Sequence, residues 1–198
     1  MAASDIEIVN RALTLLGVDP INSLSDTSKA ASTASRIYND TRSAVFRAHP
    51  WNCLVKRAAL PLDAATPLYG FNYQFVLPAD YLRLLGIQDT TGRYSIENRK
   101  ILYDSNTLNI SYIALVTDVP SYDTLLVDTL AARLAADLAH PLLQTQQSME
   151  SMWQLYELKL REAKLINAQE NQQDVLDTDY WLNSRLGVSP TVGAPSRW

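Results

Sequence analysis

The chain has 198 residues, of which 47% are hydrophobic and 19% are charged, and its net charge is −4. This composition excludes a chain that is disordered along most of its length, and the acidic balance argues against a dedicated nucleic-acid-binding protein. The single cysteine, Cys53, excludes an intramolecular disulfide and a cysteine-rich zinc site. Residues 1–5 lack the features of a signal peptide, and no apolar stretch is long enough for a membrane span. We therefore expect a soluble protein without a membrane partner, which stays in the cytoplasm or leaves the cell by a route other than secretion.

Two helices are predicted at the N-terminal end. Ser4 and Glu7 have the spacing of a capping box, and apolar residues then recur at helical intervals up to Gly17, a typical helix end. A second helix is predicted over 28–47. Its stripe of mostly small residues would let another backbone approach closely, and Pro50 ends it because proline disfavours helical geometry in the residue before it.

Six short segments in the middle of the chain are rich in β-branched, leucine and tyrosine residues and are separated by Asn, Asp, Gly and Pro. These segments are 54–62, 73–77, 84–88, 94–97, 100–103 and 108–116. We expect them to form a small antiparallel sheet, with a helical turn at 79–85. In the last segment, alternation places Leu108, Ile110 and Tyr112 on one face.

Two long helices are predicted after Pro120. The first carries four leucines at intervals of four residues and is expected to break or kink at Pro141. The second covers 142–169 and would be about 42 Å long, which is typical of a strut or a bundle member. Its apolar stripe contains Trp153 and Tyr156, which we interpret as core residues, as we do Phe46 and Trp51.

The predicted fold class is α+β. It consists mainly of an α-helical bundle with long antiparallel helices, plus a small antiparallel β domain in the middle of the chain. The predicted divisions are an N-terminal helical hairpin (1–53), the β domain (54–119), the long C-terminal helices (120–170) and an extended docking tail (171–198).

No arrangement of catalytic residues stands out in the sequence. The two histidines, His49 and His140, each precede a proline, and we interpret them as residues at helix C-termini, where the dipole favours positive charge. Nucleophile-elbow, phosphate-loop and metal-binding motifs are absent, and a lone Cys53 is typically buried and inert. We predict no enzyme, no cofactor and no metal. Carboxylates that only folding brings together leave glycan hydrolysis open as an alternative.

Five basic residues fall in one window that contains a single acid, Asp40. Such a cluster can meet phosphate or an acidic protein surface. The other interpretation is a solvated helix face, in which Arg36 pairs with Asp40. The candidate basic face consists of Arg36, Arg42, Arg47, Lys56 and Arg57.

The last residues of the chain change character. An acidic, polar stretch is followed by an apolar anchor and a tail rich in Pro, Gly and Ser. Aromatic and arginine side chains in such a tail are suited to anchoring in a partner's pocket. The candidate docking residues are Tyr180, Trp181, Arg185, Arg197 and Trp198.

Several segments, taken in order, carry a resemblance. They are NRALTLLG at 10–17, PINSL at 20–24, RIYNDTR at 36–42, HPWN at 49–52, KRAAL at 56–60, FVLPADYLR at 75–83 and WLNSR at 181–185. This ordered set resembles tail tubular protein A, the head-to-tail adaptor of short-tailed bacteriophages. The match is weakest over 89–106 and in the final tail.

The resemblance implies a structural virion protein located in the neck region of the tail and assembled in the host cytoplasm. Such proteins form a dodecameric ring between the portal protein and the tail nozzle, tail tubular protein B, with tail fibres near that junction. Genomic DNA passes through the lumen without sequence-specific binding. The implied fold is a helical bundle with a small β domain. Residues 174–198 are expected to dock against the portal. A tail-associated cell-wall or glycan hydrolase and a connector of a long-tailed phage remain alternatives.

Overall fold

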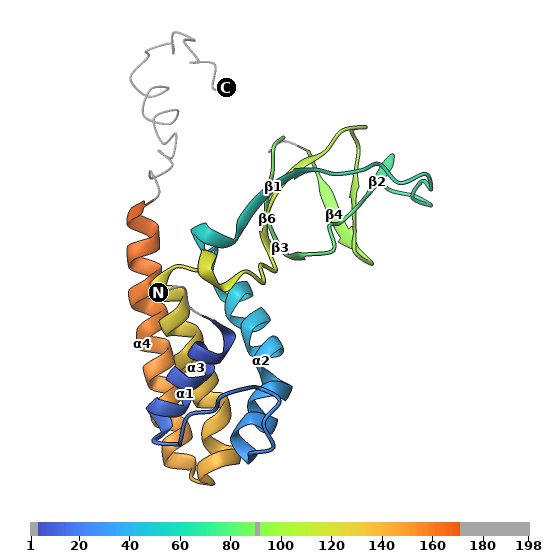
Figure 1. Cartoon of the computed structure of the whole chain (residues 1–198). Coiled ribbons are helices and arrows are strands. Elements are labelled where there is room, and N and C mark those ends of the chain that lie inside the picture. Colours follow the sequence, from blue (N-terminus) through green and yellow to red (C-terminus); the bar gives the residue numbers. More distant parts are fainter. Residues whose placement is uncertain (1–3, 90–91, 171–198) are drawn as a thin grey trace, which may run out of the picture. The chain divides into compact units, whose positions relative to one another are not determined.

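The computed structural model describes residues 4–89 and 92–170 and shows a mixed α and β architecture, as predicted (Figure 1). Two helices precede the strands and two follow them. The helices are α1 (Asp5–Leu16), α2 (Lys29–Ala48), α3 (Thr124–Leu143) and α4 (Gln146–Glu170). The strands are β1 (Val55–Ala59), β2 (Tyr73–Val76), β3 (Tyr81–Ile87), β4 (Tyr94–Glu97), β5 (Lys100–Tyr103) and β6 (Asn109–Ala114).

The predicted boundaries of the first helix are confirmed. The Ser4 hydroxyl accepts a hydrogen bond from the Glu7 backbone N–H at 3.2 Å, and the Glu7 carboxylate accepts one from the Ser4 N–H at 3.1 Å. Together these bonds satisfy two of the donors that a helix N-terminus leaves free. Gly17 adopts a left-handed conformation (φ 68°) and closes the other end.

Helix α3 is the centre of the helical part, because both α1 and α2 pack against it. The four leucines that recur at intervals of four residues are fully buried, and Ala31 and Ala34 of α2 are buried as well. The small side chains of α2 let the backbones approach closely, as the sequence predicts. The leucines are Leu126, Leu130, Leu134 and Leu138.

Of the break or kink predicted at Pro141, the break is wrong, because α3 continues through this residue to Leu143. Proline removes one backbone donor, but its fixed φ is compatible with helical geometry, so the helix can continue past it. The helix ends at Gln144, which takes a left-handed conformation (φ 55°) and donates its N–H to the carbonyl of His140 at 2.9 Å. The break between α3 and α4 therefore lies at Gln144.

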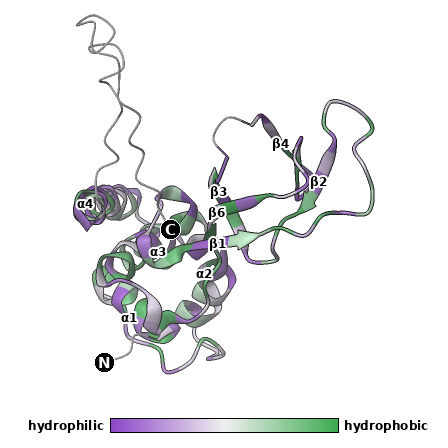
Figure 2. Cartoon of the chain, turned by 90° about the horizontal axis from the view of Figure 1, so that it is seen from above, coloured by the Kyte–Doolittle hydropathy of each residue, from purple (hydrophilic) through white to green (hydrophobic). Residues whose placement is uncertain are grey.

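Helix α4 buries little of its surface. Only Tyr156 and Ala163 among its residues are buried. Trp153 is 39% exposed, so its assignment to the core is wrong, whereas Phe46, Trp51 and Tyr156 are buried as predicted. In Figure 2 the helix lies beside the other three. A bundle in which α4 packs closely along its length is not observed.

The strands form two three-stranded antiparallel sheets, in the orders β1-β6-β3 and β2-β5-β4, where we predicted one sheet. The helical turn predicted at 79–85 is also wrong. The chain makes a single turn, in which the Tyr81 N–H donates to the Pro78 carbonyl at 3.1 Å, and then enters β3. Pairing with β6 supplies the backbone hydrogen bonds that outweigh the local preference for a turn.

Strand β6 faces two hydrophobic cores. Ile110 and Tyr112 lie in the core of the β part with Leu108, as the alternation predicts. Ile113, one position further on, lies in the core shared with the helices. Because successive side chains point to opposite faces of a strand, one strand contributes to both cores.

Candidate interaction surfaces

The two histidines lie at helix ends, as predicted. His49 follows the last residue of α2, and its ring meets Trp51 edge-on with the centroids 5.1 Å apart. Burial lowers the pKa of His49, and the positive charges of Lys164 and Arg83 lower it further. His140 lies in the last turn of α3. Within residues 4–89 and 92–170, no group of His, Cys, Asp and Glu side chains could hold a metal ion.

The five residues of the candidate basic face do not form one surface. Arg36 and Arg57 are exposed, but Arg42 is buried, with only 7% of its surface exposed. Arg42 falls on the buried stripe of α2 that also contains Ala34, Tyr38 and Val45. Helical spacing from these apolar residues is therefore the signal that could have placed Arg42 inside.

Arg42 belongs to a polar cluster between the first two helices. The Tyr38 hydroxyl donates to the Asp5 carboxylate at 2.6 Å, and the Arg42 guanidinium lies 4.0 Å from the same carboxylate. Arg42 also donates to Asn39 at 3.0 Å and lies 5.4 Å from the centroid of the Tyr38 ring. Burial and the hydrogen bond to Asp5 raise the pKa of Tyr38 far above its usual value. The cluster is a structural feature of these two helices, because Tyr38, Asp5, Asn39 and Arg42 contact one another. The Arg42 Nε is the exception, since it is buried without a hydrogen-bond partner among the described residues.

Arg47 and Lys56 are engaged where the helices meet the strands. The Arg47 side chain donates to the carbonyl of Leu82 in β3, and Arg83 of the same strand donates to the Arg47 carbonyl at 2.8 Å. The second bond places a cation at the C-terminal end of α2, where the dipole favours it. Lys56 forms an ion pair with Asp80 at 2.8 Å.

A groove of about 950 Å³ runs between α2, α3 and α4. Its walls are mostly apolar, and the carboxylates of Asp40, Asp137 and Glu150 also line it. The guanidinium of Arg133 lies 4.3 Å from the centroid of Trp153, so this tryptophan stacks on a cation rather than entering the core. We call this the α4 groove; its apolar lining includes Ile37, Ala44, Ala136, Met149 and Trp153.

A second groove, of about 790 Å³, lies on another side of α4, between α1 and α3. Arg11 and Asp128, which form an ion pair, belong to its lining, together with Glu7 and Lys159. The two grooves explain why α4 is poorly buried, since its side chains reach the other helices only along a narrow strip.

The loop between β1 and β2 exposes two large side chains that were not among the predicted site residues. Leu68 is 99% exposed and Tyr69 is 86% exposed. The base of this loop is fixed by Arg93, which donates to the Asp104 carboxylate at 3.0 Å and to the Gly70 carbonyl at 2.6 Å. The sequence signal is the uncharged stretch AATPLYGFN at 64–72.

The predicted docking residues in the tail, Tyr180, Trp181, Arg185, Arg197 and Trp198, lie outside the described residues. The division at 171–198 therefore stays a prediction.

The comparisons with known proteins do not assign the chain to a family. It matches no family model and shows no significant similarity to a curated protein. In the part of the chain that the structure describes, none of the helices has the length and apolar character needed to cross a lipid bilayer.

Proposed function

We propose that this protein is a structural virion protein of the tail tubular protein A type, a head-to-tail adaptor of a short-tailed bacteriophage. Copies would form a dodecameric ring in the neck of the tail, between the portal protein and the nozzle protein, with tail fibres near the junction. The ring would leave a lumen for genomic DNA. In this assembly the helices, α4 included, would act as a bundle of long antiparallel helices.

The observation that supports the proposal is where the resembling segments lie within the described part of the chain. They provide the contacts that join separate elements. Asn10, from the first segment, exchanges two hydrogen bonds of 2.9 Å with the backbone of Ile21 from the second. Residues of this kind determine a fold, so an ordered set of them favours a shared fold over a chance likeness of surface residues.

The other resembling segments within residues 4–89 behave in the same way. Tyr38 and Arg42, from RIYNDTR, form the buried cluster with Asp5. Asn52, from HPWN, bonds to Asn167 of α4. Asp80, from FVLPADYLR, binds Lys56 from KRAAL. The step from a shared fold to a shared function is an analogy, and it is the step that the experiment must test.

The charge of the chain is compatible with a DNA conduit. Strong binding to phosphates requires many Lys and Arg contacts. Here the net charge is −4, and Arg42, Arg47 and Lys56 are engaged within the chain. A lumen built from such subunits would let DNA slide without holding it.

Light scattering of the purified protein, alone and mixed with a candidate portal protein, tests the proposal. We expect a collar of about twelve copies on the portal, the number that the resemblance implies, held by one heterologous contact that repeats around the ring. A chain that ends at residue 173 should stay folded and lose portal binding, since we assign portal docking to 174–198. Failure of the full chain to bind the portal would overturn the adaptor function, and glycan hydrolysis would then be assayed.

A further inference from the structure

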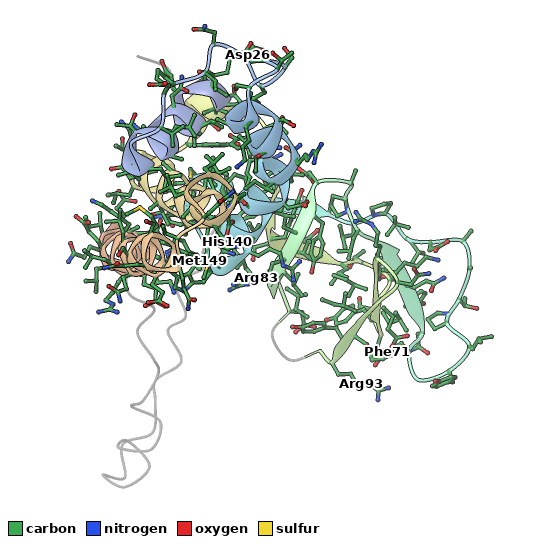
Figure 3. All side chains as sticks on the ribbon, turned by 90° about the horizontal axis from the view of Figure 1, so that it is seen from below. Asp26, Phe71, Arg83, Arg93, His140 and Met149 are labelled. Carbon is green, nitrogen blue, oxygen red and sulfur yellow. The ribbon has the colours of Figure 1, made fainter. Side chains whose placement is uncertain are left out.

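The loop that carries Leu68 and Tyr69 is built to present them. Arg93 fixes the loop through Asp104 and Gly70, and its guanidinium lies 5.0 Å from the centroid of the Phe71 ring (Figure 3). Gly70 takes a left-handed conformation (φ 84°) that favours glycine. A loop with a fixed base loses less conformational entropy on docking than a free one. Two large apolar side chains on such a loop are therefore suited to insertion into another surface.

The α4 groove has the chemistry to receive these side chains. At about 950 Å³ it reaches the upper end of typical ligand pockets, about 300–1,000 Å³. Met149 and Trp153 are partly exposed along it and would lose water contact on being covered. The stretch AATPLYG at 64–70 has no charge to place among apolar walls, and the Tyr69 hydroxyl could donate to one of the groove's carboxylates.

Within one copy, the loop does not occupy the groove, because Leu68 and Tyr69 are exposed. Each copy therefore offers one loop and one groove, in equal numbers. The geometry points to a second copy of this chain as the occupant: we infer that Leu68 and Tyr69 of one copy insert into the α4 groove of the next. The loop and the groove belong to different elements, so the contact is heterologous and propagates from copy to copy until a ring closes. Closure into a ring rests on the proposed function; the contact itself does not.

The inference is tested by disabling each half of the contact in the full chain. The loop variant is Leu68→Ser with Tyr69→Ser, and the groove variant is Ala44→Arg, at an exposed position of α2. The control is Leu165→Ser, which removes an apolar side chain that is 63% exposed on α4 and does not line the groove. Association is measured by analytical ultracentrifugation over a range of concentrations, and again on the portal. We expect the loop and groove variants to associate at least about tenfold more weakly than the control, because buried anchor residues dominate interfaces.

Mixing the two variants gives the sharper result. The loop variant keeps its groove and the groove variant keeps its loop, so the mixture should form a heterodimer that grows no further. A photo-crosslinker in place of Tyr69, in isotope-labelled copies, should attach to the groove segment around Met149 or Trp153 of unlabelled copies. This measurement does not depend on how the groove variant folds.

Each other outcome is decisive. The inference would be overturned if the loop variant associated as strongly as the control. It would also be overturned if the crosslinks formed at residues outside the α4 groove. A chain that stays monomeric at every concentration and on the portal would also overturn the inference. If separate copies still bound the portal in that case, the adaptor function would be supported. Association through the loop without portal binding would overturn the adaptor function and support the inference.

Discussion

Asn167, near the end of α4, is held by Asn52 at the start of the β part. The Asn52 N–H donates to the side-chain oxygen of Asn167 at 3.1 Å, and the Asn52 amide donates to the Asn167 carbonyl at 3.4 Å. The Asn167 amide in turn donates to the carbonyl of Pro50 at 3.2 Å. Only two residues of α4 are buried, so these bonds add to the packing of Met152, Leu155 and Leu160 in holding the helix in place.

We therefore expect Asn167→Ala to lower the free energy of unfolding by about 1–3 kcal/mol, since partly buried backbone groups lose their partners. Urea denaturation followed by tryptophan fluorescence measures the change, because Trp51 lies between Pro50 and Asn52 in the sequence, both of which bond to Asn167. The control is Gln169→Ala, at an exposed position of the same helix. Equal stabilities of the two variants would contradict the role assigned to this contact.

Arg42 and Arg36 lie on the same helix, one buried and one exposed, and form a matched pair. Arg42→Ala removes the cation beside Asp5 and its contact with Tyr38, and leaves a partly enclosed carboxylate without compensation. We expect a loss of about 1–3 kcal/mol, mainly from the lost packing of the buried arginine and its hydrogen bond to Asn39, since the Asp5 carboxylate is partly exposed to water. Arg36→Ala should change stability by about 0.5 kcal/mol or less. Denaturant titration of both variants measures the two losses. If Arg42 belonged to a surface binding site and did not stabilise the fold, both variants would lose the same small amount of stability.

Features set by neighbouring residues were predictable from the sequence. The capping box at Ser4, the left-handed Gly17 and the alternation in β6 depend on local spacing, and all are observed. The partition of six strands into two sheets depends on pairings between distant segments, which local patterns do not encode. Trp153 was misplaced for a related reason, because Arg133, which stacks on it at the edge of a groove, is not a sequence neighbour. For Arg42 the helical spacing did indicate burial, but the acidic partner of the cation, Asp5, lies on another helix.

His49 should make stability depend on pH. Burial, together with Lys164 and Arg83, lowers its pKa in the folded state, so the unfolded chain binds more protons between that pKa and about 6.5. Stability is then at its full value above about pH 6.5, falls as the pH drops through this window and levels off below the folded pKa. Asp80 acts at lower pH: burial opposes its ionisation, but the hydrogen bonds from Lys56 and Tyr112 outweigh it and lower the pKa.

The measurement is the free energy of unfolding at about pH 7.5 and about pH 5, on either side of the ordinary histidine pKa. We expect wild type to be less stable at the lower pH and His49→Phe to lose much of this difference while keeping an aromatic ring against Trp51. His140→Gln, at an exposed position, should behave like wild type. If the free energy of unfolding of His49→Phe depended on pH as it does in wild type, the dependence would arise from groups other than His49.

Helix α4 should open more readily than α3, because local stability follows the burial of apolar side chains. The stack of Arg133 on Trp153 and Tyr156, at 4.3 and 5.3 Å, is a main contact across the α4 groove and is worth about 0.5–2 kcal/mol. Hydrogen exchange should therefore show faster exchange in α4 than in α3, and Arg133→Gln should speed exchange in α4 while leaving the centre of α3 protected. Lys159→Gln, which removes a cation from the exposed i,i+3 pair with Glu162, is the control and should change little.

Equal protection of the two helices would mean that α4 is held by contacts stronger than its burial indicates. Faster exchange confined to α4 would show that the wall of the proposed docking groove can move, which a groove must do to admit two side chains from another copy.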